Sequence, residues 1–82
     1  MNRQKMSNIP LADFRRFLKD MGCAQGKGHG GHEKWEREGL TRPIVIQTHI
    51  DPVPMLVINT TLRTLGISKK QFLEYYYKMG KK

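Results

Sequence analysis

Apolar residues recur along the chain with two different periods, and the change of period predicts where helices give way to strands. In the first third, apolar side chains follow one another at steps of three and four, which places them on one stripe of a helix. They are Leu11, Phe14, Phe17, Leu18 and Met21. Pro10 suits the first turn of a helix and Gly22 suits its end. The pattern therefore predicts an amphipathic helix between these two residues.

Three segments with strand character follow the predicted helix. They are residues 23–27, residues 32–38 and residues 42–49. The middle segment alternates around Trp35, which places this side chain and His32 on opposite faces of a strand. The last segment contains consecutive β-branched residues, which favour strands. Glycine-containing turns at 28–31 and 39–41 separate the segments. Short strands joined by such turns predict an antiparallel meander.

The C-terminal third returns to helical spacing. Two prolines within residues 51–54 end the sheet region, and the next apolar face stops at Gly66. Its members are Val57, Ile58, Leu62 and Leu65. Ser68 and Gln71 have the spacing of a capping box, which predicts the start of a last helix. The expected fold class is α+β in the order α-β-β-β-α, with the final helical part broken at Gly66.

The length of 82 residues allows one small domain. We expect residues 1–8 to form a flexible lead-in, residues 9–78 the domain and residues 79–82 a basic tail.

The single cysteine excludes an internal disulfide framework and a cysteine-rich zinc module. No apolar run is long enough to span a bilayer. We therefore expect a cytoplasmic protein that does not enter a membrane.

Charge narrows the choice of partner. Fifteen Lys and Arg residues stand against seven Asp and Glu residues, so the formal net charge is +8. A basic domain of this kind favours an anionic partner, with nucleic acid first and an acidic protein second.

The residues best suited to chemistry lie in the segment 27–35, where glycines flank two histidines and a lysine stands near each end. Glycines let the backbone approach a ligand closely, and lysines supply a positive field for phosphate. Histidine both accepts and donates a proton near neutral pH. RNA cleavage needs a base for the 2′-hydroxyl and an acid for the departing 5′-oxygen. The alternative interpretation is a surface turn with incidental histidines.

Metal binding is the other chemistry open to histidine, and the spacing disfavours it. His29 and His32 are three residues apart in a glycine-rich turn rather than on a helix face, and no paired cysteines or HExxH pattern occurs. We therefore expect neither a metal nor another cofactor. His49 closes the third predicted strand. In a meander this position lies near the start of the second strand, so His49 is a secondary site candidate.

The run Gly30-Gly31-His32-Glu33-Lys34-Trp35 resembles the signature of the HicA toxin family. That signature has a glycine, a small residue and a histidine, followed three positions later by an aromatic residue. The order of the elements also matches, and Leu65-Gly66-Ile67-Ser68 is similar to the Ala-Gly-Leu-Ser ending of a helix in that family. The resemblance covers roughly residues 9–74.

This resemblance implies a fold like the double-stranded RNA-binding domain, with helices packed on one face of a three-stranded antiparallel sheet. It implies a toxin that cleaves mRNA, inhibits translation in a stress response and is held in check by a HicB-like antitoxin protein. The family's catalytic histidine falls on His32, and its strand-end histidine falls on His49.

The resulting hypothesis is a metal-independent endoribonuclease with His32 as the catalytic acid and base. His29 and His49 are possible auxiliary groups. The expected RNA contacts are Lys27, Gly30, Gly31, Lys34, Arg37 and Arg42. One alternative is a non-catalytic RNA-binding module of the same fold, which holds RNA by shape and phosphate contacts. Another is a basic protein that only docks an acidic partner.

Overall fold

One helix, three strands and two further helices follow one another in the computed structural model, which describes residues 8–78. The elements are α1 (Leu11–Asp20), β1 (Ala24–Gln25), β2 (His32–Glu36), β3 (Ile44–Gln47), α2 (Met55–Leu65) and α3 (Lys69–Lys78). This arrangement confirms the expected α+β class and the order of elements. The expected basic tail and all but the last residue of the expected lead-in lie outside the described residues.

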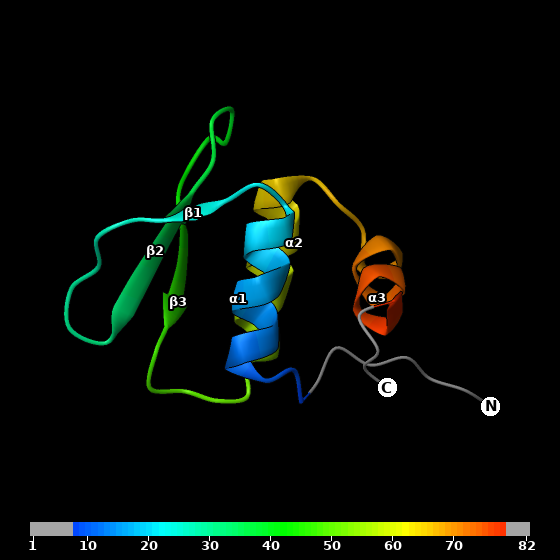
Figure 1. Cartoon of the computed structure of the whole chain (residues 1–82), viewed down its shortest axis with the longest axis horizontal. Coiled ribbons are helices and arrows are strands. Elements are labelled where there is room, and N and C mark those ends of the chain that lie inside the picture. Colours follow the sequence, from blue (N-terminus) through cyan, green and yellow to red (C-terminus); the bar gives the residue numbers. More distant parts are fainter. Residues whose placement is uncertain (1–7, 79–82) are drawn as a thin grey trace.

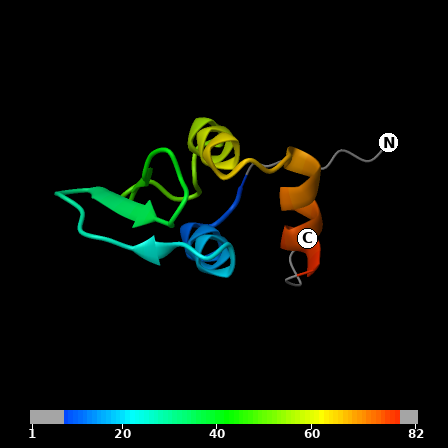
Figure 2. The ribbon, with the colours of Figure 1, turned by 90° about the horizontal axis from the view of Figure 1, so that it is seen from above.

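The elements form three layers (Figures 1 and 2). The antiparallel sheet, in the order β1-β2-β3, is the first layer, and α1 and α2 lie side by side against one of its faces. The third layer is α3, on the far side of these two helices. The other face of the sheet carries no helix of the described residues. Within residues 8–78, none of the helices has the length and apolar character needed to cross a membrane.

Side chains alternate strictly across β2. Trp35 is buried on the face toward the helices, opposite Ile44 of β3, whereas His32 is exposed on the outer face, opposite Gln47. The predicted separation of Trp35 and His32 is thus confirmed. All three strands are shorter than expected. β2 ends at Glu36, and the guanidinium of the next residue, Arg37, donates a hydrogen bond to the Met21 carbonyl (2.7 Å).

The core between the helices is aromatic. Phe14 and Phe17 of α1 meet Phe72 of α3, and the rings of Phe17 and Phe72 pack edge to face with centroids 4.8 Å apart. All three are fully buried. The expected capping box starts α3, since Gln71 N–H donates to Ser68 Oγ (3.0 Å) and Ser68 N–H donates to Gln71 Oε1 (2.8 Å). Aromatic packing holds α3 against α1, and the cap stabilises the first turn of α3.

A carboxylate is buried on the inner face of the sheet. Glu33 is only 7% exposed, and its two oxygens accept four hydrogen bonds. Arg15 of α1 binds both oxygens, Oε1 at 3.0 Å and Oε2 at 3.1 Å. Gln25 of β1 donates to Oε2 (3.1 Å) and the indole N–H of Trp35 donates to Oε1 (2.8 Å). One side chain of β2 thus joins α1, β1 and β2.

The same contacts determine the charge state of Glu33. Burial alone would raise the pKa of this carboxyl, but the hydrogen bonds from Arg15 and Trp35 and the positive charge of Arg15 outweigh burial and lower the pKa. A lowered pKa in the folded state means that ionisation favours folding. The stabilisation that ionised Glu33 gives the folded state is fully present above the pKa of this carboxyl in the unfolded chain, about 4.3. It is lost as the pH falls from there through the folded-state pKa.

We predict that Glu33→Gln lowers the free energy of unfolding at pH 7 by about 2 kcal/mol, because the new amide would turn its own N–H groups toward donors. The variant should also lose less stability than wild type as the pH falls below about 4.3. Urea unfolding followed by the fluorescence of Trp35 measures both effects. Glu36→Gln, an exposed change on the same strand, is the control and should stay within about 0.5 kcal/mol of wild type. Equal stability of the two variants would contradict the role of Glu33.

Candidate active site

The start of β2 and the end of β3 lie side by side and gather the histidines of the chain. His32 pairs with Gln47, and Thr48 donates hydrogen bonds to the Gly31 carbonyl from its N–H (2.7 Å) and its hydroxyl (3.2 Å). His49 follows directly. We call this part of the molecule, made of residues 27–32 and 47–49, the histidine end of the sheet.

The glycines of this segment are required by close contacts. A Cβ atom on Gly28 would lie 2.0 Å from the His32 carbonyl oxygen, and one on Gly31 would lie 2.7 Å from Nδ1 of His49. Gly30 has a φ of 58°, in the left-handed region that favours glycine. The loop therefore folds back tightly on β2. The His49 ring rests against the backbone of Gly31, the residue immediately before His32.

His32, His29 and His49 are all exposed, and their positions are linked through the backbone. The His32 N–H donates to the His29 carbonyl (3.0 Å), so the loop residue that bears the second imidazole is fixed beside the strand. Two exposed histidines on one end of a sheet are groups of the type that can act as proton acceptor and proton donor. The predicted proximity of the end of the third strand to the start of the second is confirmed by the register.

The expected RNA contacts fall into two groups. Lys27, Gly30 and Gly31 belong to the histidine end, and Lys34 follows two residues after His32 on the same outer face. Arg37 and Arg42 lie beyond the other end of the sheet, where β2 has ended and β3 has not begun. A run of five residues along a strand separates Arg37 from His32 by roughly 16 Å. The guanidinium of Arg37 is also engaged by the Met21 carbonyl.

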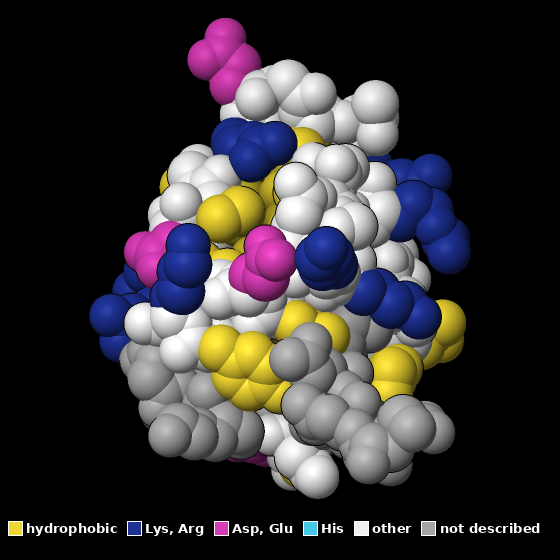
Figure 3. All heavy atoms as spheres, turned by 90° about the vertical axis from the view of Figure 1, so that its right-hand side faces the viewer, with side chains coloured by type: hydrophobic (Ala, Val, Ile, Leu, Met, Phe, Trp, Pro, Cys, Tyr) yellow, Lys and Arg dark blue, Asp and Glu magenta, His cyan; other side chains and the backbone are white. Residues whose placement is uncertain are grey.

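Positive charge is not confined to the sheet. Figure 3 views the α3 side of the molecule, where several Lys and Arg side chains are exposed and no histidine is in view. Charge alone therefore does not mark the site. The distinguishing feature of the histidine end is the combination of exposed imidazoles, lysine and tight glycine backbone.

Glu33 is the residue of this region that sequence reasoning missed. Its carboxylate fixes the inner face of β2, so the preceding residue, His32, must point outward. The sequence did indicate that Glu33 is buried, because Glu33 and Trp35 are two residues apart in a strand and must share a face. Glu33 is a positioning residue for His32.

Among residues 8–78, no group of three or more His, Cys, Asp and Glu side chains is arranged to hold a metal ion. None of the comparisons with protein-family models, curated proteins and solved structures gives a match. The choice of function therefore depends on the chemistry of the histidine end and on the resemblance carried by its residues.

We predict that Gly31→Ala displaces the ring of His49, because the added methyl group would lie 2.7 Å from Nδ1. The ring is exposed and can swing outward, so the free energy of unfolding should change by less than about 1 kcal/mol. The measurement is the nuclear magnetic resonance signal of the His49 imidazole. Gly26→Ala is the matched control, since its methyl group would meet neighbouring atoms at 3.6 Å, an ordinary contact. An unchanged His49 signal in Gly31→Ala would show that the ring does not rest there.

Proposed function

We propose that this protein is an endoribonuclease that cleaves mRNA, with His32 as the general acid or the general base, and that it acts as a HicA-like toxin. The observation that carries the proposal is the placement of His32. It stands exposed on the uncovered face of the sheet, directly after Gly30 and Gly31, with the imidazole of His49 held against Gly31. Gly30, Gly31 and His32, which begin the run that resembles the HicA signature, belong to this end of the sheet.

The proposed reaction is a transfer of the phosphodiester within the RNA. One imidazole takes the proton of a 2′-hydroxyl, whose oxygen attacks the neighbouring phosphorus. The bond to the 5′-oxygen breaks, and the second imidazole, protonated, donates a proton to that oxygen. The products are a 2′,3′-cyclic phosphate and a 5′-hydroxyl. We assign His32 to one role and His49 to the other, because the His49 ring lies against Gly31, the residue directly before His32. The proposed chemistry needs no metal ion.

Substrate binding in this proposal depends on phosphate contacts. Lys27 is exposed in the loop before His32, and Lys34 follows on the same face of β2. Both can attract a phosphate toward the histidines. Arg42, at the other end of the sheet, would contact a more distant part of a bound strand. A HicB-like antitoxin protein is the proposed inhibitor, and the cytoplasm, where mRNA is translated, is the proposed location.

We predict that His32→Ala lowers the rate of RNA cleavage by a factor of roughly 10² to 10⁴, the usual effect of removing a general acid or base. The side chain is exposed, so the free energy of unfolding should change by less than about 0.5 kcal/mol. RNA affinity should change little, because the lysines remain. Cleavage of a labelled RNA, fluorescence anisotropy of RNA binding and urea unfolding measure the three effects.

Glu36→Gln changes an exposed residue on the same face of the same strand and is the control, with cleavage close to that of wild type. Undiminished cleavage by the folded His32→Ala protein would contradict the assignment of His32. Tight RNA binding by a wild-type protein that never cleaves would favour the non-catalytic RNA-binding module instead.

A further inference from the structure

Within residues 8–78, no strand pairs with the outer edge of β3. The sheet order places β3 at one edge, paired with β2 alone. The hydrogen bond from Thr48 N–H to the Gly31 carbonyl shows which residues face β2. Backbone groups alternate in direction along a strand, so Ile46 faces β2 like Thr48, and the N–H and C=O of Val45 and Gln47 point to the free edge. An edge of this kind is a template for another strand.

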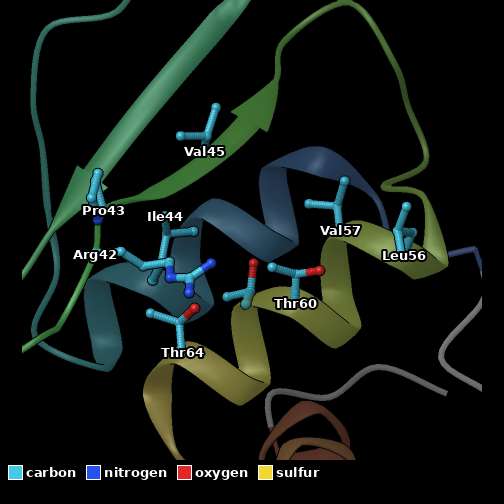
Figure 4. Close-up of a pocket in the computed structure, with 9 residues that line it drawn as sticks. Arg42, Pro43, Ile44, Val45, Leu56, Val57, Thr60 and Thr64 are labelled. Atoms are coloured by element: carbon cyan, nitrogen blue, oxygen red, sulfur yellow. The ribbon is translucent and has the colours of Figure 1, made fainter.

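A groove runs along this edge between β3 and α2 (Figure 4). Its volume is about 190 Å³, and its lining includes Pro43, Ile44, Val45, Leu56, Val57 and Thr60. Leu56 is 76% exposed at its rim and Val45 is 47% exposed. Sites for small molecules usually have volumes of about 300 to 1,000 Å³. The groove is smaller than that and is better suited to a side chain of a neighbouring polypeptide.

The charge beside the groove indicates the nature of that polypeptide. An adjoining hollow of about 160 Å³ shares Arg42, Thr60 and Thr64 with the groove and adds Arg63. Both arginines are exposed, and none of the residues that line the two hollows is acidic. A carboxylate next to an apolar side chain would complement this surface.

We infer that β3 and α2 form a docking groove for an extended segment of an acidic protein. The segment adds a strand to the edge of β3 through Val45 and Gln47, places an apolar side chain against Leu56 and Val57, and directs a carboxylate toward Arg63. Strand addition of this type takes affinity from the backbone and specificity from alternate side chains. A second copy of the chain is disfavoured because each copy carries a net charge of +8.

The groove of this docking surface lies away from the histidine end, since Arg42 and Ile44 lie at the opposite end of β3. The two surfaces share Gln47, whose side chain and backbone are not assigned a part in the proposed cleavage. The inference therefore does not depend on ribonuclease activity. A loss of docking and a loss of cleavage can be measured independently, the first with peptides and the second with RNA.

The test uses peptides selected from a random library of about a dozen residues displayed on phage. The selection is made on the full chain, with heparin in the washes to remove ligands held by charge alone. We expect peptides with alternating apolar residues and at least one Asp or Glu. In nuclear magnetic resonance spectra, a bound peptide should shift the amide signals of Val45, Gln47 and Thr60 and leave those of Lys27 and His29, in the loop of the histidine end, unchanged.

Two variants with matched controls identify the contacts. Val45→Pro removes an N–H that points to the free edge, and Val45→Thr keeps it. Leu56→Ser removes an apolar side chain at the rim of the groove, and Met55→Ser removes a comparable exposed one outside the groove. We expect Val45→Pro and Leu56→Ser each to weaken peptide binding about tenfold, and Met55→Ser to bind like wild type. Val45→Thr should bind more tightly than Val45→Pro, because it changes the side chain and keeps the N–H. Leu56→Ser lies on an exposed position and gives the answer even if Val45→Pro does not fold.

Several results would overturn the inference. The first is a selection that yields no peptide, and the second is a set of selected peptides that shift the amide signals of Lys27 and His29 instead of those of Val45 and Thr60. Peptides bound equally well by Leu56→Ser and wild type would exclude the groove. A concentration-dependent dimer that disappears in Val45→Pro would assign the edge to a second copy of this chain.

Discussion

The burial of one charge constrains the whole sheet. Transferring a carboxylate from water into a protein interior has an effective penalty of several kcal/mol unless it is paired and hydrogen bonded. Glu33 meets this requirement with four hydrogen bonds from α1, β1 and β2. A shift of β2 by one residue would expose this carboxylate and bury His32. The contact between Arg15 and Glu33 therefore sets the register that keeps the imidazole of His32 in solvent, and the proposed chemistry depends on it.

The two ends of the sheet differ in character because different residues terminate the strands. At one end, glycines permit a loop so tight that the His49 ring touches the backbone of Gly31. Small residues and exposed imidazoles there favour a flexible anionic substrate such as RNA. At the other end, Pro43 and Arg42 precede β3, and the adjoining face of α2 offers apolar side chains and threonines. That surface favours a polypeptide. One small domain thus presents two surfaces with different partners in our proposals.

Three features were predicted correctly from the sequence: the helical face of α1, the meander and the capping box at Ser68. They depend on the periodicity of apolar residues and on local hydrogen bonds. The position of α3 was not predicted, because its packing on Phe14 and Phe17 depends on tertiary contacts that no local pattern specifies. The proximity of His49 to His32 followed from the topology of a meander. Grouping Arg37 and Arg42 with the histidines did not allow for the length of β2, which separates them. Glu33 was not identified from the sequence, although its alternation with Trp35 places both side chains on the same face of the strand.

The central claim is that RNA is cleaved by proton transfer at the histidine end, with the 2′-hydroxyl as the nucleophile. The most direct measurement is the chemistry of the product ends, obtained with EDTA present on an RNA whose cleavage position has been mapped. The account predicts 2′,3′-cyclic phosphate and 5′-hydroxyl ends, and no cleavage when the nucleotide that supplies the 2′-hydroxyl at that position is replaced by its 2′-deoxy form. Products with 3′-hydroxyl and 5′-phosphate ends, or cleavage of the deoxy-substituted RNA at the same position, would contradict it.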